Sequence, residues 1–325
     1  MDIQLKILLL SFGISVVLGL LIITVLKKFK VGQIERDDGP ESHLSKQGTP
    51  TMGGVIIVLL LIIMSILMFF FFRKSKPDML PKIMQLTFIT IGFGLVGLVD
   101  DFKKLVLKNT KGLKPMYKML GLLLIAVAYT IYLVKFSDLG TTMYLPIMKT
   151  TITLPIWLYV PFAILVLLGT TNAVNLTDGI DGLASSVSTI ILTCLVSISI
   201  IMGVEVTSVF GAVVIGGCLG FLLFNLHPAK VFMGDTGSLL LGGAISGIAL
   251  YLRMPLILLI IALVPIIETL SVIIQVAYFK KTGKRIFKMA PIHHHFELSG
   301  WKEEKVVSVF SIVTLVLCII GIAIV

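Results

Sequence analysis

Long apolar runs alternate with polar loops along this chain. Each run is long enough to cross about 30 Å of hydrocarbon as a helix. The pattern predicts ten membrane-spanning helices, near residues 3–26, 52–72, 83–99, 118–136, 155–172, 183–203, 207–225, 237–252, 254–278 and 305–325. We therefore expect an all-α polytopic integral membrane protein in which residues 1–325 form a single transmembrane domain.

The composition agrees with a membrane protein. Of 325 residues, 57% are hydrophobic and 14% are charged, whereas soluble domains are about 45–50% apolar. The three cysteines lie inside apolar runs without metal-like spacing, which is typical of packing residues. The sequence contains no module of basic and aromatic residues that would indicate a nucleic-acid partner. We therefore relate the net charge of +10 to the orientation in the membrane and to contacts with anionic lipid headgroups.

The positions of Lys and Arg predict the orientation. If both termini are outside, the inner loops hold 19 of the 27 basic residues and the outer segments hold 8. Basic residues are enriched on the cytoplasmic side of membrane proteins. The outer loop near Arg73 runs against this rule, but the reversed orientation fits worse. We expect the long inner loops, rich in Gly, Asn, Asp and His, to carry an active site at the cytoplasmic surface.

One inner segment, 172–183, places an Asn or Asp at every third position. Polar side chains at this depth need partners, so the segment predicts a polar cavity, although an ordinary turn rich in Asx residues is the alternative. On a helix, each step of three residues turns the side-chain direction by about 60°, so the first and last polar residues of the segment would face opposite sides. This rotation, together with Gly179 and Gly182, favours a bent loop that wraps a ligand. Its polar members are Asn172, Asn175, Asp178 and Asp181.

Two further inner loops carry carboxylates. Asp100 and Asp101 end the third run, at the unfavourable end of a helix dipole, so we expect them to bind a cation or a proton. The basic stretch after them is a topology determinant or an anion-binding segment. Asp235 lies in Gly-Asp-Thr-Gly-Ser at the start of a run, where it is either a helix cap or a hard oxygen ligand for Mg²⁺. Nearby, Phe232 could stack on a planar base or anchor at the membrane interface.

The remaining inner loops offer cations. Lys46 precedes a Gly- and Pro-rich turn, and its ammonium group is suited to bind phosphate. The alternative is that the turn only begins the next helix. Residues 293–295 are three consecutive histidines, which cannot all face one metal from a regular element, so they favour proton transfer or hydrogen bonding to phosphate. Pro265 should kink the ninth run near Glu268, an intramembrane acid whose role stays open.

One motif is a false lead. Residues 92–97 read Gly-Phe-Gly-Leu-Val-Gly and match a dinucleotide-binding fingerprint. They follow no strand and open no helix of a βαβ unit, so we interpret them as close helix packing in the membrane.

Together the loops predict phosphoryl transfer onto or from a lipid. Bringing one phosphate up to another costs about 4 kcal/mol per unit pair of charges at 4 Å with an effective dielectric constant of 20. A metal ion and lysines would offset that repulsion.

In this order, the motifs resemble those of the phospho-N-acetylmuramoyl-pentapeptide-transferases, over essentially the full length. This family is a branch of the polyprenyl-phosphate N-acetylhexosamine-1-phosphate transferase superfamily. The superfamily marks are Asp100-Asp101, 172–183 and 232–238. The marks of the branch are 48–54, 111–113 and 291–297.

The resemblance implies an enzyme of the bacterial plasma membrane with cytoplasmic catalytic loops. It would transfer phospho-MurNAc-pentapeptide from UDP-MurNAc-pentapeptide to undecaprenyl phosphate, giving lipid I for peptidoglycan synthesis, and UMP. Mg²⁺ would be required, and a homodimer is left open.

The resemblance also implies residue roles. Asp235 would bind Mg²⁺, Asp100 would be the base on the lipid phosphate, Asp101 and Lys104 would support the phosphates, and His293 would act near the diphosphate. The substrate-binding residues would be Lys46, Lys104, Asn172, Asn175, Asp178, Asp181, Asn225, Phe232 (against uracil) and His294.

Two alternatives remain at this point. A sister enzyme that uses UDP-N-acetylglucosamine for another surface polymer would share the chemistry and differ mainly in the His loop. A transporter or flippase would use the inner acids to bind a coupling cation, and it would release no UMP.

Overall fold

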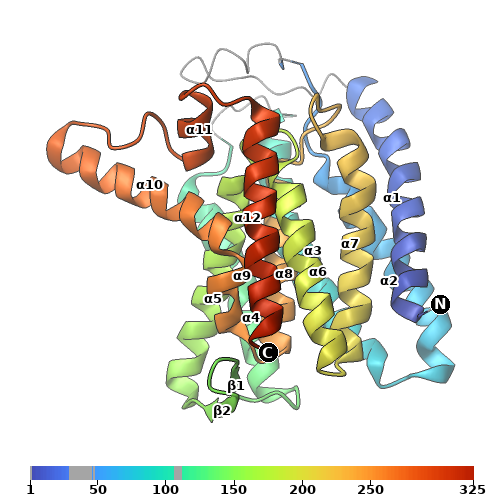
Figure 1. Cartoon of the computed structure of the whole chain (residues 1–325). Coiled ribbons are helices and arrows are strands. Elements are labelled where there is room, and N and C mark those ends of the chain that lie inside the picture. The colour runs from blue at the N-terminus through green and yellow to red at the C-terminus, as the bar shows by residue number, and fades with distance from the viewer. Residues whose placement is uncertain (1, 29–45, 47, 106–111) are drawn as a thin grey trace.

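The computed structural model describes residues 2–28, 46, 48–105 and 112–325, and most of them are helical. The elements form an upright helical bundle (Figure 1). The helices are α1 (Ile3–Lys28), α2 (Gly54–Ser75), α3 (Met79–Leu105), α4 (Pro115–Lys135), α5 (Ile156–Thr177), α6 (Leu183–Ile201), α7 (Glu205–Asn225), α8 (Gly234–Tyr251), η2 (Pro255–Ile257), α9 (Leu258–Ile261), α10 (Leu263–Thr282), α11 (Ile292–Glu297) and α12 (Glu303–Ala323).

Nine helices within the described ranges are long and apolar enough to cross a membrane, so the chain is a multi-pass membrane protein. They are α1 to α7, α10 and α12. The eighth expected span, 237–252, corresponds to α8, which is helical but is not among the nine. This helix contains Asp235 and five glycines in 18 residues, which lowers its hydropathy, and it is buried from Thr236 to Tyr251. It is the centre of the bundle.

The predicted all-α class is confirmed, except that one connection is not helical. Between α4 and α5 lies a two-stranded antiparallel hairpin, in which β1 (Thr142–Leu145) pairs with β2 (Thr150–Thr153). The β-branched threonines favour the extended backbone. The hairpin covers the end of the bundle at which both labelled termini lie (Figure 1).

The ninth predicted span, 254–278, is broken. It consists of η2, α9 and α10, with Ala262 outside helical geometry at φ −107° and ψ 24°. Proline lacks an N–H donor, and its ring clashes with the carbonyl four residues earlier, so Pro265 accounts for a break near Ile261. Beyond the break α10 leans away from the bundle (Figure 1).

Helix α5 is longer than predicted. It continues to Thr177, so Asn172 and Asn175 are helical, and the predicted bent loop is reduced to 178–182. Gly182 then adopts φ +77°, which turns the chain into α6.

Glycines allow α8 to approach its neighbours closely. A Cβ on Gly97 of α3 would clash with the carbonyl oxygen of Asp235, and one on Gly54 of α2 would clash with the backbone of Gly237. The pattern at 92–97 is therefore helix packing, as predicted. The same contacts bring the end of α3 against the start of α8.

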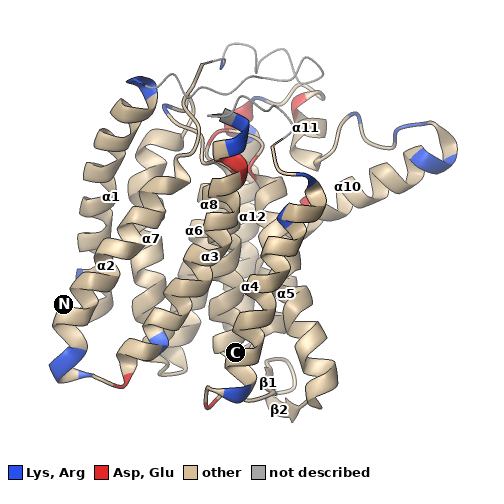
Figure 2. Ribbon diagram, turned by 180° about the vertical axis from the view of Figure 1, so that it is seen from behind, with Lys and Arg blue, Asp and Glu red and all other residues tan. Residues whose placement is uncertain are grey.

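Charged residues gather at the end of the bundle opposite the hairpin. Figure 2 shows Asp, Glu, Lys and Arg together near the start of α8 and around α11. Because both termini lie toward the hairpin end (Figure 1), the chain ends and this polar region are at opposite ends of the bundle.

The close approach of α3 and α8 can be tested with Gly97→Ala. The added methyl group would force the backbone of Asp235 to move, at a cost of about 1–3 kcal/mol typical of overpacking. We expect a lower midpoint of thermal unfolding in detergent. The matched control is Gly169→Ala in α5, where nothing lies within 4 Å of the new Cβ and alanine favours the helix. Equal midpoints for the two variants would contradict the close packing.

Candidate active site

Asp101 binds the start of α8. Its Oδ1 accepts a hydrogen bond from the Asp235 N–H at 3.1 Å, and its Oδ2 accepts from the N–H and the hydroxyl of Thr236 at 2.9 and 2.6 Å. A carboxylate is favourable at a helix N-terminus because it meets unpaired N–H groups and the positive end of the dipole. Gly234 has φ +73°, and a Cβ there would lie 2.7 Å from Asp101 Oδ2. Asp101 therefore fixes the backbone of Asp235.

The Asp235 carboxylate joins four helices. Its Oδ2 lies 2.8 Å from Lys104 Nζ of α3 and 3.1 Å from Lys118 Nζ of α4. Its Oδ1 accepts from Asn175 Nδ2 of α5 at 2.7 Å, and the same amide donates to Ser238 Oγ at 2.8 Å. Lys118 was not predicted, because nothing separates it in the sequence from the other lysines of its basic stretch.

Asp100 lies beside this group and is buried. Its Oδ2 is 2.6 Å from Lys104 Nζ, and its Oδ1 accepts from the Leu113 N–H at 2.6 Å. Gly112, at φ +61°, leaves room for that contact, since a Cβ would lie 2.6 Å from Asp100 Oδ1. Asp100 and Asp235 thus share one ammonium group. Lys111 of the same motif lies outside the described residues.

Asp178 begins the turn after α5. Burial, and then the charges of Asp235, Asp101 and Asp181, raise the pKa of its carboxyl group to about 8, against a hydrogen bond from the Gly234 N–H that lowers it. The carboxyl group of Asp178 therefore holds a proton at neutral pH. A cation placed among these acids would favour release of that proton.

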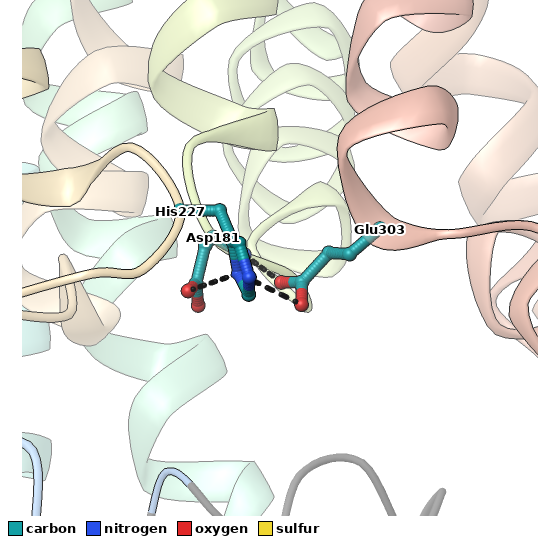
Figure 3. A group of neighbouring side chains, drawn as sticks. All are labelled: Asp181, His227 and Glu303. Atoms are coloured by element: carbon teal, nitrogen blue, oxygen red, sulfur yellow. Dashed lines mark hydrogen bonds and ion pairs between the residues drawn. The ribbon is translucent and has the colours of Figure 1, made fainter.

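A second cluster surrounds Asp181 (Figure 3). Lys46 Nζ lies 2.8 Å from Asp181 Oδ1 and 2.5 Å from Glu303 Oε1. His227 Nδ1 lies 3.1 Å from Asp181 Oδ2, and the Asp181 N–H donates to Glu303 at 2.6 Å. Burial lowers the pKa of Lys46, but Asp181 and Glu303 outweigh this, and the pKa is raised. Lys46 is therefore an ammonium ion bound between two carboxylates.

This second cluster has the spacing of a metal site. Single ligand atoms of Asp181, His227 and Glu303 lie within 4.8 Å of one another, so the three could hold a metal ion. In the structure the Lys46 ammonium already bonds two of them. His227 and Glu303 were not predicted. His227 lies two residues after Asn225, a predicted substrate-binding residue, whereas Glu303 begins the last span without any signal.

Two predicted substrate-binding amides are used within the fold. Asn225 accepts from Ser185 Oγ at 2.6 Å and donates to the Val231 carbonyl at 3.0 Å. Asn172 donates to the Leu168 carbonyl of its own helix at 2.7 Å. The structure does not bring either amide into the two charged clusters.

Phe232 is positioned by backbone pairing between two loops. Its N–H donates to the Pro50 carbonyl, and its carbonyl accepts from the Gly53 N–H, both at 2.8 Å. The turn at 48–54 therefore fixes the loop that carries Phe232 and leads into α8.

His293 and His294 lie together in α11, with ring centroids 4.1 Å apart. His294 Nδ1 is 2.7 Å from Glu297 Oε2. His293 is fully buried, and its Nδ1 lies 3.1 Å from Oε2 of Glu268. The acid that the sequence placed inside the ninth span thus contacts the predicted catalytic histidine.

Comparisons with known proteins match this arrangement of motifs. A family model described as Glycosyl transferase family 4 matches residues 83–253, and a Phospho-N-acetylmuramoyl-pentapeptide-transferase signature matches residues 46–58. A phospho-N-acetylmuramoyl-pentapeptide-transferase of Acetivibrio thermocellus is 50% identical over 313 residues, 96% of this chain and 92% of the relative. Its namesake in Clostridium kluyveri is 48% identical over 96% of both chains. The chain therefore belongs to the phospho-N-acetylmuramoyl-pentapeptide-transferase family.

Proposed function

We propose that this chain transfers phospho-MurNAc-pentapeptide from UDP-MurNAc-pentapeptide to undecaprenyl phosphate. A phosphate oxygen of the lipid attacks the β-phosphorus of the nucleotide sugar, the bond between the two phosphates of UDP breaks, and lipid I and UMP form. The observation that carries the proposal is the group of Asp100, Lys104, Lys118 and Asp235 at one end of a membrane bundle. Family membership supports the same reaction.

The two lysines act on the charge of the reactants. Donor and acceptor are both phosphates, so bringing them together is opposed by repulsion of about 4 kcal/mol per unit pair at 4 Å. Lys104 of α3 and Lys118 of α4 both contact Oδ2 of Asp235, and both are partly exposed. They can exchange a bond to the carboxylate for one to a phosphate, which stabilises the leaving UMP.

Asp100 is our candidate for the base on the lipid phosphate. It is the member of the Asp pair whose carboxylate faces Lys104, whereas both oxygens of Asp101 bond to α8. We therefore assign Asp101 to positioning and not to contact with substrate. The sequence had predicted that Asp101 supports the phosphates directly, and our assignment replaces this with an indirect role.

Mg²⁺ fits the first cluster better than the second. Asp235 and Asp100 offer carboxylate oxygens and Asn175 offers an amide oxygen, which are the hard donors that Mg²⁺ prefers. Three carboxyl groups, those of Asp100, Asp101 and Asp235, meet two lysines here, so the cluster has room for added positive charge. Bound to Asp235, the ion would neutralise the diphosphate. The second cluster includes an imidazole, which is a softer donor, and the Lys46 ammonium already bonds both of its carboxylates.

We place the charged end of the bundle in the cytoplasm of a bacterial cell and the hairpin end outside. The excess of Lys and Arg in the loops of the charged end supports this orientation. Nucleotide sugars are soluble substrates, so they would reach the site from the cytoplasm, while the lipid would enter from the bilayer. A homodimer stays a prediction from the family resemblance.

Release of UMP by the purified protein tests the function. With undecaprenyl phosphate and Mg²⁺, we expect UMP from UDP-MurNAc-pentapeptide and none from UDP-N-acetylglucosamine. Chelation of Mg²⁺ and the variant Asp235→Asn should each reduce the rate to background, because the metal site is lost. Asp138→Asn is the matched control, since that side chain is 96% exposed at the hairpin end, and it should keep full activity.

Release of UMP from UDP-N-acetylglucosamine alone would assign the chain to the sister reaction. An Asp235→Asn variant that folds and turns over normally would remove the metal assignment.

The orientation is tested by labelling single cysteines in a variant that lacks Cys194, Cys218 and Cys318. Met148→Cys at the hairpin tip should react with a membrane-impermeant maleimide in intact cells, because Met148 is 73% exposed. Lys284→Cys, in the exposed loop after α10, should react only after permeabilisation. The opposite pattern would invert our topology.

A further inference from the structure

Glu268 is an acid inside a membrane helix whose partner is a histidine of another element. Glu268 lies six residues after the break at Ala262 in the ninth span, and both it and His293 are 0% exposed. Glu268 Oε2 is 3.1 Å from His293 Nδ1 and also accepts from the His293 N–H at 3.5 Å. Within the described residues neither ring nitrogen has a hydrogen-bond partner, so Glu268 holds His293 through the main-chain N–H and lies close to the ring without bonding to it.

The other ring nitrogen of His293 faces the turn that follows α5. A Cβ on Gly179 would clash with His293 Nε2, so the ring lies directly against the Gly179 backbone. Within the described part of the chain, no hydrogen-bond partner reaches Nε2. Gly179 follows Asp178 and precedes Asp181 by two residues, so the ring supports the segment that joins the two charged clusters.

This contact joins three separate elements. Helix α10 packs against α5 and α11, and beyond Ala262 it leans away from the bundle (Figure 1). The Glu268 carboxylate therefore holds α11 at the point where α10 diverges. His293 is fully buried in this arrangement, and its side chain contacts the turn.

We infer that Glu268 is a positioning residue: it holds His293 against Gly179 and thereby fixes the Asp178–Asp181 turn to which the nucleotide sugar binds. The inference rests on the proposed function. It assigns no proton transfer to Glu268 or His293. If Glu268 only stabilised α10, its loss would change KM for both substrates alike. If it positions the turn, its loss would change KM for the nucleotide sugar alone.

Steady-state kinetics of Glu268→Gln separate the two cases. This variant keeps the shape of the side chain and loses its charge. We expect KM for UDP-MurNAc-pentapeptide to rise by roughly 10- to 100-fold, as for other residues that orient a site through a second residue, and KM for undecaprenyl phosphate to stay unchanged. The matched control is Leu270→Ala, two residues further along α10 and 46% exposed, with both KM values unchanged.

A second variant covers poor folding of Glu268→Gln. Gly179→Ala leaves Glu268 intact but displaces the His293 ring. It should raise KM for the nucleotide sugar and leave KM for the lipid unchanged. An equal rise for both substrates in either variant would overturn the inference.

Binding of UMP gives a measurement that is independent of turnover. Titration calorimetry on the purified protein should show weaker UMP binding in Glu268→Gln and in His293→Ala, and no further loss in the double variant, because Glu268 acts through His293. Losses that multiply, or a Glu268→Gln variant that binds UMP like the wild type, would overturn the inference. Wild-type protein that binds no UMP would instead refute the proposed function on which it rests.

Discussion

The bond network between Asp101 and the start of α8 is the interaction on which the rest of the site depends. A buried carboxylate is costly unless its oxygens are paired, and here three donors from Asp235 and Thr236 pair them. The same bonds satisfy N–H groups that a helix start leaves unpaired. Because glycines at 97, 54 and 234 allow the close approach, α8 is fixed at the centre of the bundle with Asp235 facing Asp100 and the lysines.

Charge balance explains how so many acids are held at one end of a membrane protein. Lys104 lies between Asp100 and Asp235, and Lys46 lies between Asp181 and Glu303. Asp178 carries a raised pKa, because it is buried near the charges of Asp235, Asp101 and Asp181. Ammonium groups and a proton therefore offset part of the carboxylate charge of the site, and a bound metal ion would offset more.

Hydropathy predicted the helices because hydrocarbon imposes length and apolarity on each span, and these are local properties. It did not predict the hairpin at 142–153 or the helical continuation of α5 through Asn175, which depend on neighbouring elements. The break at Ala262 follows from Pro265, which predicted a kink in this run but nearer to Glu268. Hydropathy also predicted α8 to be an ordinary membrane span, whereas it is a glycine-rich helix of lower hydropathy that buries its surface against protein.

The same distinction applies to the site. Asp100 and Asp235 could be predicted because carboxylates at helix ends near a membrane need a cation. The capping role of Asp101, the internal bonds of Asn225 and the participation of Lys118, His227 and Glu303 could not, because each depends on an approach between distant segments. A sequence shows which groups are costly to bury, and only the fold shows which partners they meet.

The affinity of the site for Mn²⁺, an analogue of Mg²⁺ that is visible by electron paramagnetic resonance, tests most directly whether Asp101 places Asp235. In Asp101→Asn the amide can accept through one atom only, and the charge at the start of α8 is lost. We predict a folded protein whose Mn²⁺ affinity is weaker by roughly 10- to 100-fold, the usual effect of removing a group that orients a metal ligand. An Asp101→Asn variant that binds Mn²⁺ as tightly as the wild type would contradict the account.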